Sequence, residues 1–323
     1  MKKTVLILLI LSFAVLSCKK QAAQDTFTGD PAALKATVGI SKIIPHPALD
    51  AIEQGTMDEL KSLGFTNLTY DLQSANGEIS TAASIAGKYK SQNVAVSVGI
   101  ATPMALALAN SIKGPIVFSA VTDPVDAELR KNIGREATNI TGVSDMTPIK
   151  AQFDLIVRLT GAKKLGHVYN AGEANSLVLL HMLEGLCAAG GVELITSTVN
   201  YTSEVKQATE VLASKGVDAI YVSTDNIVAA AINSVTTTAE KYGIPVIGAD
   251  PVTSKDTGAL AAYGVDYYKA GRQTGRMVAA ILQGTSPGDI PVKFMTEPDE
   301  LTLYIDSKVA NKLGIKIPED LLK

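Results

Sequence analysis

The chain has 323 residues, of which 46% are hydrophobic and 19% charged, so it can bury the cores of two domains of ordinary size. A formal net charge of −3 argues against nucleic acid or a polybasic membrane patch as a partner. Two cysteines and three scattered histidines exclude a disulfide framework and the usual ligand spacing of a metal site, so we expect no metal and no cofactor.

The first residues predict export. A short basic start precedes an almost wholly apolar run over residues 5–16, which Ser17 and Cys18 close. This run is too short to cross a bilayer as a stable helix and has the layout of a signal peptide. A cysteine directly after a small residue predicts removal of residues 1–17 and lipidation (palmitate-type acylation) of Cys18. The protein would then be anchored to the cell membrane on its periplasmic or extracellular face. A plain signal peptide or an N-terminal anchor is the alternative.

Residues 18–34, which start at the lipidated cysteine, are polar and small and predict a flexible tether. Short β-branched runs then alternate with amphipathic helical stretches. The predicted strands are 36–41, 67–71, 94–98, 115–119, 165–169, 192–198, 219–222 and 244–248. A helix is predicted over 47–63, with Pro47 in its first turn and Gly64 after its end. This alternation predicts α/β architecture, with parallel sheets covered by helices on both faces.

One pattern occurs in both halves of the chain. A strand leads through Ala101-Thr102-Pro103 into a helix rich in Ala and Leu, and another leads through Thr224-Asp225-Asn226 into a similar helix. The following strand ends in Asp123-Pro124 in the first half and in Asp250-Pro251 in the second. Ligands of open parallel sheets bind at the carboxyl ends of the strands, so two such lobes facing each other would form a cleft. A coincidence of common turn residues is the alternative.

The residues at this predicted edge suit a zwitterion. Carboxylates suit an ammonium group, and helix starts with free backbone N–H groups suit a carboxylate. The simplest such ligand is a free amino acid. The carboxylates are Asp123, Asp225 and Asp250, and the neutral polar residues are Thr102, Ser119, Thr122, Asn175, Ser176 and Thr224. Each Asp taken alone is more typical of a helix cap or a turn.

The sequence does not indicate an enzyme. It contains no G-x-S-x-G elbow, and residues 170–176 lack the glycines and the lysine of a phosphate-binding loop. Cys187 is expected to be a buried, inert thiol, and Gly271 and Gly275 to be tight packing points within a helix. His46 either caps the helix that begins at Pro47 or projects towards the cleft.

Several of these stretches resemble a known family, the ABC transporter substrate-binding proteins that include tryptophan and tyrosine uptake proteins. The matching segments, in order through nearly the whole chain after the leader, are 46–50, 100–103, 117–124, 139–145, 169–176, 224–226, 266–268 and 271–275. Ser223 stands where the family pattern leads us to expect proline. The resemblance implies a type I periplasmic-binding-protein fold, in which two doubly wound, Rossmann-like lobes are joined by three crossover segments.

The resemblance also implies a division of the chain and a set of ligand-binding residues. The first lobe would comprise residues 35–142 and 264–295, and the second 143–263 and 296–323. The first lobe would contribute Thr102, Ser119, Thr122 and Asp123 to the cleft, and the second Asn175, Ser176, Thr224, Asp225, Asn226 and Asp250.

The function expected from the resemblance is that of a monomeric lipoprotein that captures a small solute and delivers it to an ABC permease and ATPase. The solute would be an amino acid, and the aromatic amino acids are one candidate class. The alternative is a sensory module of the same fold that presents its closed form to a signalling receptor.

Overall fold

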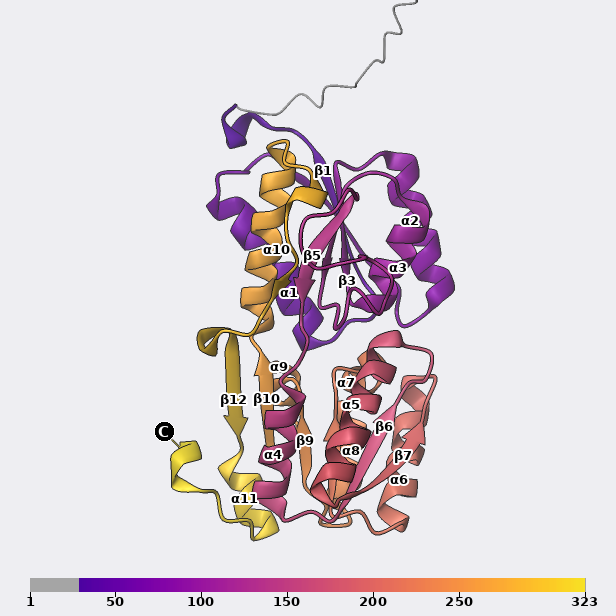
Figure 1. Cartoon of the computed structure of the whole chain (residues 1–323), viewed down its shortest axis with the longest axis vertical. Coiled ribbons are helices and arrows are strands. Elements are labelled where there is room, and N and C mark those ends of the chain that lie inside the picture. The colour runs from indigo at the N-terminus through magenta and orange to yellow at the C-terminus, as the bar shows by residue number, and fades with distance from the viewer. Residues whose placement is uncertain (1–28, 323) are drawn as a thin grey trace, which may run out of the picture.

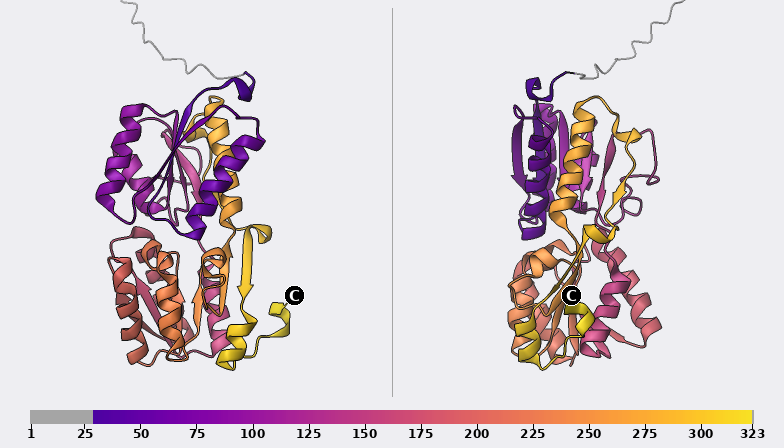
Figure 2. Two further views of the ribbon diagram at one scale, coloured as in Figure 1. Left: turned by 180° about the vertical axis from the view of Figure 1, so that it is seen from behind. Right: turned by 90° about the vertical axis from the view of Figure 1, so that its left-hand side faces the viewer.

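The computed structural model describes residues 29–322, which form two α/β lobes stacked along the long axis of the molecule (Figure 1; Figure 2). The predicted signal peptide, Cys18 and the tether up to residue 28 lie outside these residues. No helix within 29–322 is long and apolar enough to span a membrane.

Each lobe is built on a six-stranded sheet. The first sheet has the order β11-β5-β4-β3-β1-β2, and all of its strand pairs are parallel. Its strands are β1 (Thr37–Lys42), β2 (Thr69–Ser74), β3 (Val96–Ile100), β4 (Ile116–Ser119), β5 (Ile140–Ser144) and β11 (Lys293–Phe294). The helices of this lobe are α1 (Pro47–Ser62), α2 (Ile79–Gln92), α3 (Thr102–Ser111) and α10 (Tyr267–Leu282).

The second sheet has the order β12-β10-β9-β8-β6-β7. Its strands are β6 (Lys164–Tyr169), β7 (Glu193–Thr198), β8 (Ala219–Val222), β9 (Val246–Gly248), β10 (Ala261–Val265) and β12 (Leu301–Ile305). Its helices are α4 (Ile149–Thr160), α5 (Ala174–Gly190), α6 (Val205–Ser214), α7 (Asn226–Ala230), α8 (Ile232–Glu240), α9 (Pro251–Ser254) and α11 (Ser307–Leu313). Short 3-10 turns lie at Pro31–Ala33, Thr202–Glu204, Pro287–Asp289, Pro298–Glu300 and Glu319–Leu322.

The α/β expectation is confirmed, and all eight strands predicted from the sequence are present with ends shifted by a few residues. Four strands were not predicted: β5, β10, β11 and β12. β11 has only two residues, and β10 (Ala-Ala-Tyr-Gly-Val) has little β-branched character. One pair departs from the expected parallel arrangement, because edge strand β12 runs antiparallel to β10.

The chain passes between the two sheets three times: after β5, between β10 and α10, and between β11 and β12 (Figure 1). β5 continues to Ser144 and β10 to Val265, so these two passages begin slightly later than residues 142 and 263. The three connecting segments lie together on one side of the molecule, beside the contact between the lobes (Figure 2).

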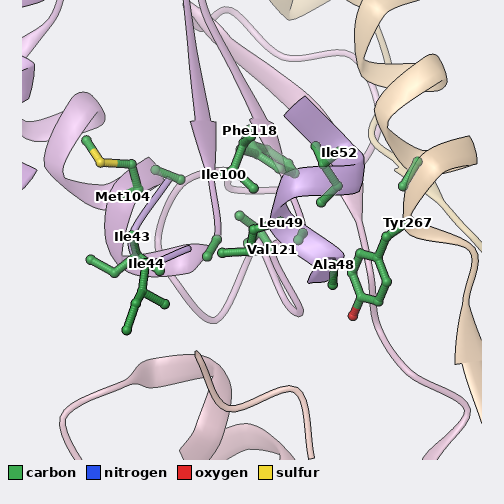
Figure 3. Close-up of a cluster of buried hydrophobic side chains, with 14 of the residues drawn as sticks. Ile43, Ile44, Ala48, Leu49, Ile52, Ile100, Met104, Phe118, Val121 and Tyr267 are labelled. Carbon is green, nitrogen blue, oxygen red and sulfur yellow. The ribbon is translucent and has the colours of Figure 1, made fainter. Parts of the chain in front are cut away.

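The apolar core reaches the edge of the first lobe that faces the second. Ile43, Ala48 and Leu49 are almost completely buried there, and Figure 3 shows them above the ribbon of the other lobe. Deeper in the same cluster lie Phe118 on β4 and Ile52 on α1. Burial of these side chains keeps the loops that follow β1, β3 and β4 in place, and those loops carry residues that face the second lobe.

Helices α1 and α10 pack closely because glycines lie between them. A Cβ added at Gly271 would come within 2.4 Å of the Ile52 carbonyl oxygen, and one at Gly275 within 2.8 Å of the Thr56 carbonyl oxygen. The expected packing role of these two glycines is therefore confirmed. Gly55 on α1 is equally close to the backbone of α10.

Candidate functional site

A cavity lies between the lobes, at the carboxyl ends of the strands of both sheets. Its volume is about 20 Å³, so the side chains that line it leave little free space in this arrangement of the lobes. The first lobe and the segment after β5 contribute His46, Leu49, Ala120, Thr122 and Asp145 to its lining. The second lobe and the start of α10 contribute Asn175, Thr224, Asn226, Ala229, Asp250 and Tyr267.

Two buried carboxyl groups face this cavity near the connecting segments. Asp145 follows β5, and the hydroxyl of Tyr267 donates a hydrogen bond to its Oδ2 at 3.0 Å. Asp250 follows β9, and its Oδ1 accepts from the backbone N–H groups of Val252 and Thr253 at the start of α9. Burial raises the pKa of each carboxyl to about 6. The Asp145–Tyr267 bond joins two of the three connecting segments.

The far end of the cavity is formed by residues after β6 and β8. The Oε2 atom of Glu173 accepts hydrogen bonds from the side-chain amides of Asn175 at 3.1 Å and Asn226 at 2.6 Å. Asn175 also donates to the backbone carbonyl of Thr224 at 3.2 Å. Burial, followed by the neighbouring Asp225 carboxylate, raises the pKa of Glu173. Asn175 Oδ1 and Thr224 Oγ1 are buried without a partner in the described part of the chain.

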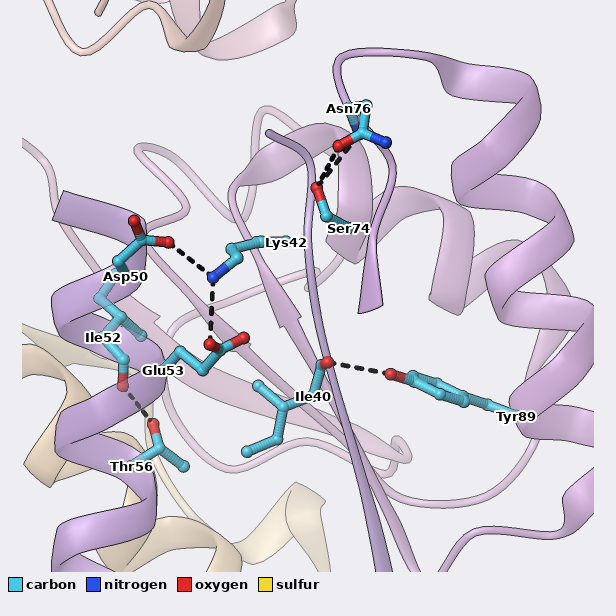
Figure 4. A network of polar contacts seen from close by, with 9 residues as sticks. All are labelled: Ile40, Lys42, Asp50, Ile52, Glu53, Thr56, Ser74, Asn76 and Tyr89. Carbon is cyan, nitrogen blue, oxygen red and sulfur yellow. Dashed lines mark hydrogen bonds and ion pairs between the residues drawn. The ribbon is translucent and has the colours of Figure 1, made fainter. Parts of the chain in front are cut away.

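The cavity carries no cationic side chain from residues 29–322. Burial lowers the pKa of His46 to about 4, so this imidazole is neutral at physiological pH. Lys42, at the end of β1, is held by Asp50 at 2.6 Å and Glu53 at 3.0 Å, as Figure 4 shows. Lys and Arg are also absent from the lining residues. The site therefore presents carboxylates and neutral polar atoms to a ligand.

The cavity brings together six of the eleven ligand-binding residues predicted from the sequence: His46, Thr122, Asn175, Thr224, Asn226 and Asp250. His46 occupies the N-cap position of α1 but makes no side-chain capping bond. Its side chain lies at the cavity, with Nδ1 at 3.5 Å from the Thr253 hydroxyl of the other lobe.

The other five predicted residues are not among the lining residues. Asp123 caps a turn through the N–H groups of Val125 and Asp126. Asp225 caps α7 and accepts a hydrogen bond from the Ser176 hydroxyl. This bond links the start of α7 to the start of α5, the helices that carry the lining residues Asn226 and Asn175.

The remaining two are buried at the carboxyl ends of β4 and β3, outside the lining of the cavity. Ser119 accepts a hydrogen bond from Thr274 of α10 at 2.8 Å. Thr102 is almost completely buried in the first turn of α3, and its hydroxyl has no partner among the described residues.

Asp145 and Tyr267 are the polar lining residues that the sequence reasoning did not select. Asp145 follows the strand that was not predicted, although the strand-end rule used for Asp250 would have found it once β5 was recognised. Tyr267 begins a helix, and no local pattern distinguishes it from its neighbour Tyr268, which is partly exposed and bonds to Asp58. Tyr267 lies at the cavity only because the chain passes back into the first lobe at this point.

The family model described as "ABC transporter substrate binding protein" matches residues 37–323. The "Tyrosine-binding protein" of Clostridioides difficile is 35% identical over 292 residues, which cover 88% of this chain and 83% of that protein. Among solved structures, an ABC domain from Streptococcus pneumonia in complex with L-Trp is 31% identical, with a TM-score of 0.85 over 90% of this chain and 98% of that one.

A further solved structure is described as the ligand-free, open form of a substrate-binding protein with adhesive properties from Clostridium difficile. It is 33% identical and covers 88% of this chain and 97% of that one, with a TM-score of 0.65.

Proposed function

Because this chain belongs to the family of ABC transporter substrate-binding proteins, we propose that it captures a free amino acid with an aromatic side chain in the cavity between its lobes and delivers it to an importer. The names of two similar proteins support the aromatic class, since one is a tyrosine-binding protein and the other was solved with L-Trp.

The observation that carries this proposal is the chemistry of the cavity. Asp145 and Asp250 place two buried carboxyls at one end, and no Lys or Arg in residues 29–322 lines the wall to neutralise them. Buried carboxylates without a cationic partner are unfavourable, so a ligand ammonium group would supply the missing charge. A sugar or an anion would not.

The backbone on the first-lobe side of the cavity is strained. Ala101, just before α3, has φ +76° and ψ 153°, a region that glycine normally occupies. Ala120 at the cavity also has a positive φ of 52°. Such strain is typical of ligand sites and supports a binding role for this edge.

The arrangement of the lobes supports a capture mechanism. Sequence identity to the L-Trp complex and to the open, ligand-free structure is nearly the same, yet the TM-score is 0.85 to the first and 0.65 to the second. We infer that the lobes here adopt the closed arrangement. In that arrangement the ligand contacts both lobes at once, so binding favours closure, and the closed shape is what the permease and ATPase complex would recognise.

The protein would act outside the cytoplasm as a monomer, held to the membrane by a lipid on Cys18 and without catalytic activity. The division into lobes at about residues 142, 263 and 295 is part of this proposal, with the connecting segments as hinges.

The experiment is a titration of purified, unrefolded protein with L-Trp, L-Tyr and a panel of other amino acids. The chain contains no tryptophan, so selective excitation of the indole reports only the ligand. We expect saturable binding of the aromatic amino acids and much weaker binding of alanine and of sugars. Native mass spectrometry of the same preparation checks for a co-purified amino acid. Failure of every amino acid to bind would remove the proposed function.

A further inference from the structure

The amide of Asn175 is held in one orientation. Both of its N–H bonds point at oxygen atoms that act as acceptors: Glu173 Oε2 at 3.1 Å, which also accepts from the backbone N–H of Asn226, and the Thr224 backbone carbonyl at 3.2 Å. Turning the amide over would place its Oδ1 against these two oxygens. Its Oδ1 must therefore point away from them, and it is a buried acceptor without a partner among residues 29–322.

Glu173 imposes this orientation without being part of the cavity wall. The same Oε2 atom also accepts from the Asn226 side chain at 2.6 Å and from the Asn226 backbone N–H at 3.3 Å. Glu173 therefore holds two lining amides, one at the start of α5 and one at the start of α7. Among the described residues, the side-chain carboxyl of Glu173 makes hydrogen bonds only to Asn175 and Asn226.

The order of strands shows where Asn175 lies relative to the carboxyls. Asp250 follows β9, Thr224 follows β8, and Asn175 follows β6, and these three strands are neighbours in the sheet. Adjacent strands are about 4.8 Å apart, so the site after β6 lies roughly 10 Å from the site after β9. An aromatic amino acid whose ammonium group is bound near Asp250 would extend its side chain along this edge.

We propose that Asn175 Oδ1, positioned by Glu173, accepts a hydrogen bond from the far end of the ligand's side chain. The site would thus select aromatic amino acids that carry a terminal donor, the phenol hydroxyl of tyrosine or the indole N–H of tryptophan, over phenylalanine. This inference rests on the proposed function. Its physical reason is that a ligand without the donor leaves the buried oxygen unpaired.

The test compares two ligands that differ by one hydroxyl group. We expect the wild-type protein to bind tyrosine roughly tenfold or more tightly than phenylalanine, as the loss of a partner for one buried acceptor predicts. Tryptophan and 1-methyltryptophan form a second pair, because the methyl group replaces the indole N–H donor. Tryptophan should likewise bind more tightly than its methylated form.

In Asn175→Leu, which has nearly the same volume, the ratio of the two affinities should fall towards one. Glu173→Leu should lower the ratio in the same way, because the Asn175 amide is then free to turn. Glu173→Gln should largely keep the ratio, since its amide oxygen still accepts. If Glu173 had only a structural role, Glu173→Leu would instead weaken the binding of tyrosine and of phenylalanine equally.

Equal wild-type affinities within both ligand pairs would overturn the inference while leaving aromatic amino-acid binding intact. An unchanged ratio in a folded Asn175→Leu variant would do the same. If none of the four ligands binds the wild-type protein, the proposed function itself fails. If a variant does not fold, the wild-type ratios still decide.

Discussion

At the scale of single residues, the main feature is the burial of Asp145 and Asp250 at a cavity that lacks a cation within the described chain. Each carboxyl accepts hydrogen bonds from neighbouring groups. Tyr267 donates to Asp145, and the start of α9 donates to Asp250. These hydrogen bonds favour the ionised forms but do not compensate burial, as the raised pKa values indicate. An ammonium group would complete the site.

The first prediction concerns these two carboxyls. Asp145→Asn and Asp250→Asn should each weaken amino-acid binding by about 2 kcal/mol, because the ammonium group loses a charged partner. Isothermal titration calorimetry measures this change. Asp123→Asn is the matched control: the sequence placed Asp123 with the ligand residues, but it caps a turn away from the lining, so its substitution should leave affinity unchanged. Wild-type affinity in both test variants would contradict the assignment.

The second prediction is a pH dependence. The ammonium group binds the ionised carboxyls, whose pKa is about 6 in the ligand-free site, so affinity should fall as the pH is lowered through 6. Binding at that pH should release protons, which calorimetry in buffers of different ionisation enthalpy detects. His46 has a pKa of about 4 and does not contribute in this range. A flat affinity between pH 5 and 7, or proton uptake, would exclude this model.

The same pKa values determine how stability changes with pH in the ligand-free protein. A carboxyl whose pKa is raised on folding binds more protons in the folded state. Asp145 and Asp250 therefore favour the folded state at low pH and lose this contribution as the pH rises towards 6. Ligand binding reverses the loss, because it stabilises the ionised forms.

At the scale of elements, the contact between α1 and α10 positions the site. α10 follows the second passage between the lobes and begins with Tyr267, and α1 begins beside His46. Glycines allow the two helices to approach closely. Glu59 on α1, which is buried, pairs with Arg272 at 2.5 Å and Arg276 at 2.7 Å on α10.

The third prediction tests this packing. Gly271→Ala should destabilise the protein by about 1–3 kcal/mol, because the new methyl group collides with the α1 backbone at Ile52. The cost of this collision exceeds the gain in helix propensity from glycine to alanine. Gly87→Ala is the matched control within α2, where a Cβ meets nothing within 4 Å, and it should be neutral or stabilising by up to about 1 kcal/mol. Urea unfolding measures both. Similar stabilities of the two variants would argue against close packing as the reason for Gly271.

At the scale of the whole molecule, the site exists only when the lobes are together. His46 and Thr122 come from the first lobe, whereas Asp250 and Asn175 come from the second. The near approach of His46 to Thr253, 3.5 Å between the two side chains, also crosses the cleft. In the proposed mechanism, closure brings together groups that belong to different lobes, so ligand binding energy would favour the closed state.

The fourth prediction concerns this closure. Small-angle X-ray scattering should show a smaller radius of gyration when the bound amino acid is present at saturation than when it is absent. Asp250→Asn at the same ligand concentration should remain closer to the ligand-free value, because less of it is occupied. Identical scattering of the free and saturated wild-type protein would contradict ligand-driven closure.

The amino-acid sequence by itself determined the α/β architecture and the existence of a polar edge in each half. Hydrophobic periodicity and strand-end residues are local properties, and they place Asp250, Thr224 and Asn226 at the edge of the sheet where the cavity lies. The same local rule also selected Asp123 and Asp225, because a carboxylate that caps a turn or a helix looks like one that faces a ligand.

Only the tertiary structure decided which polar groups share the cavity. Asp145 and Tyr267, which are 122 residues apart, meet because the chain returns to the first lobe, and sequence spacing does not encode that contact. Likewise, the orientation of Asn175 depends on where Glu173 and the Thr224 carbonyl lie around it. Burial and hydrogen-bond saturation are properties of three-dimensional surroundings, so they distinguish a ligand-facing atom from a capping one where the sequence pattern does not.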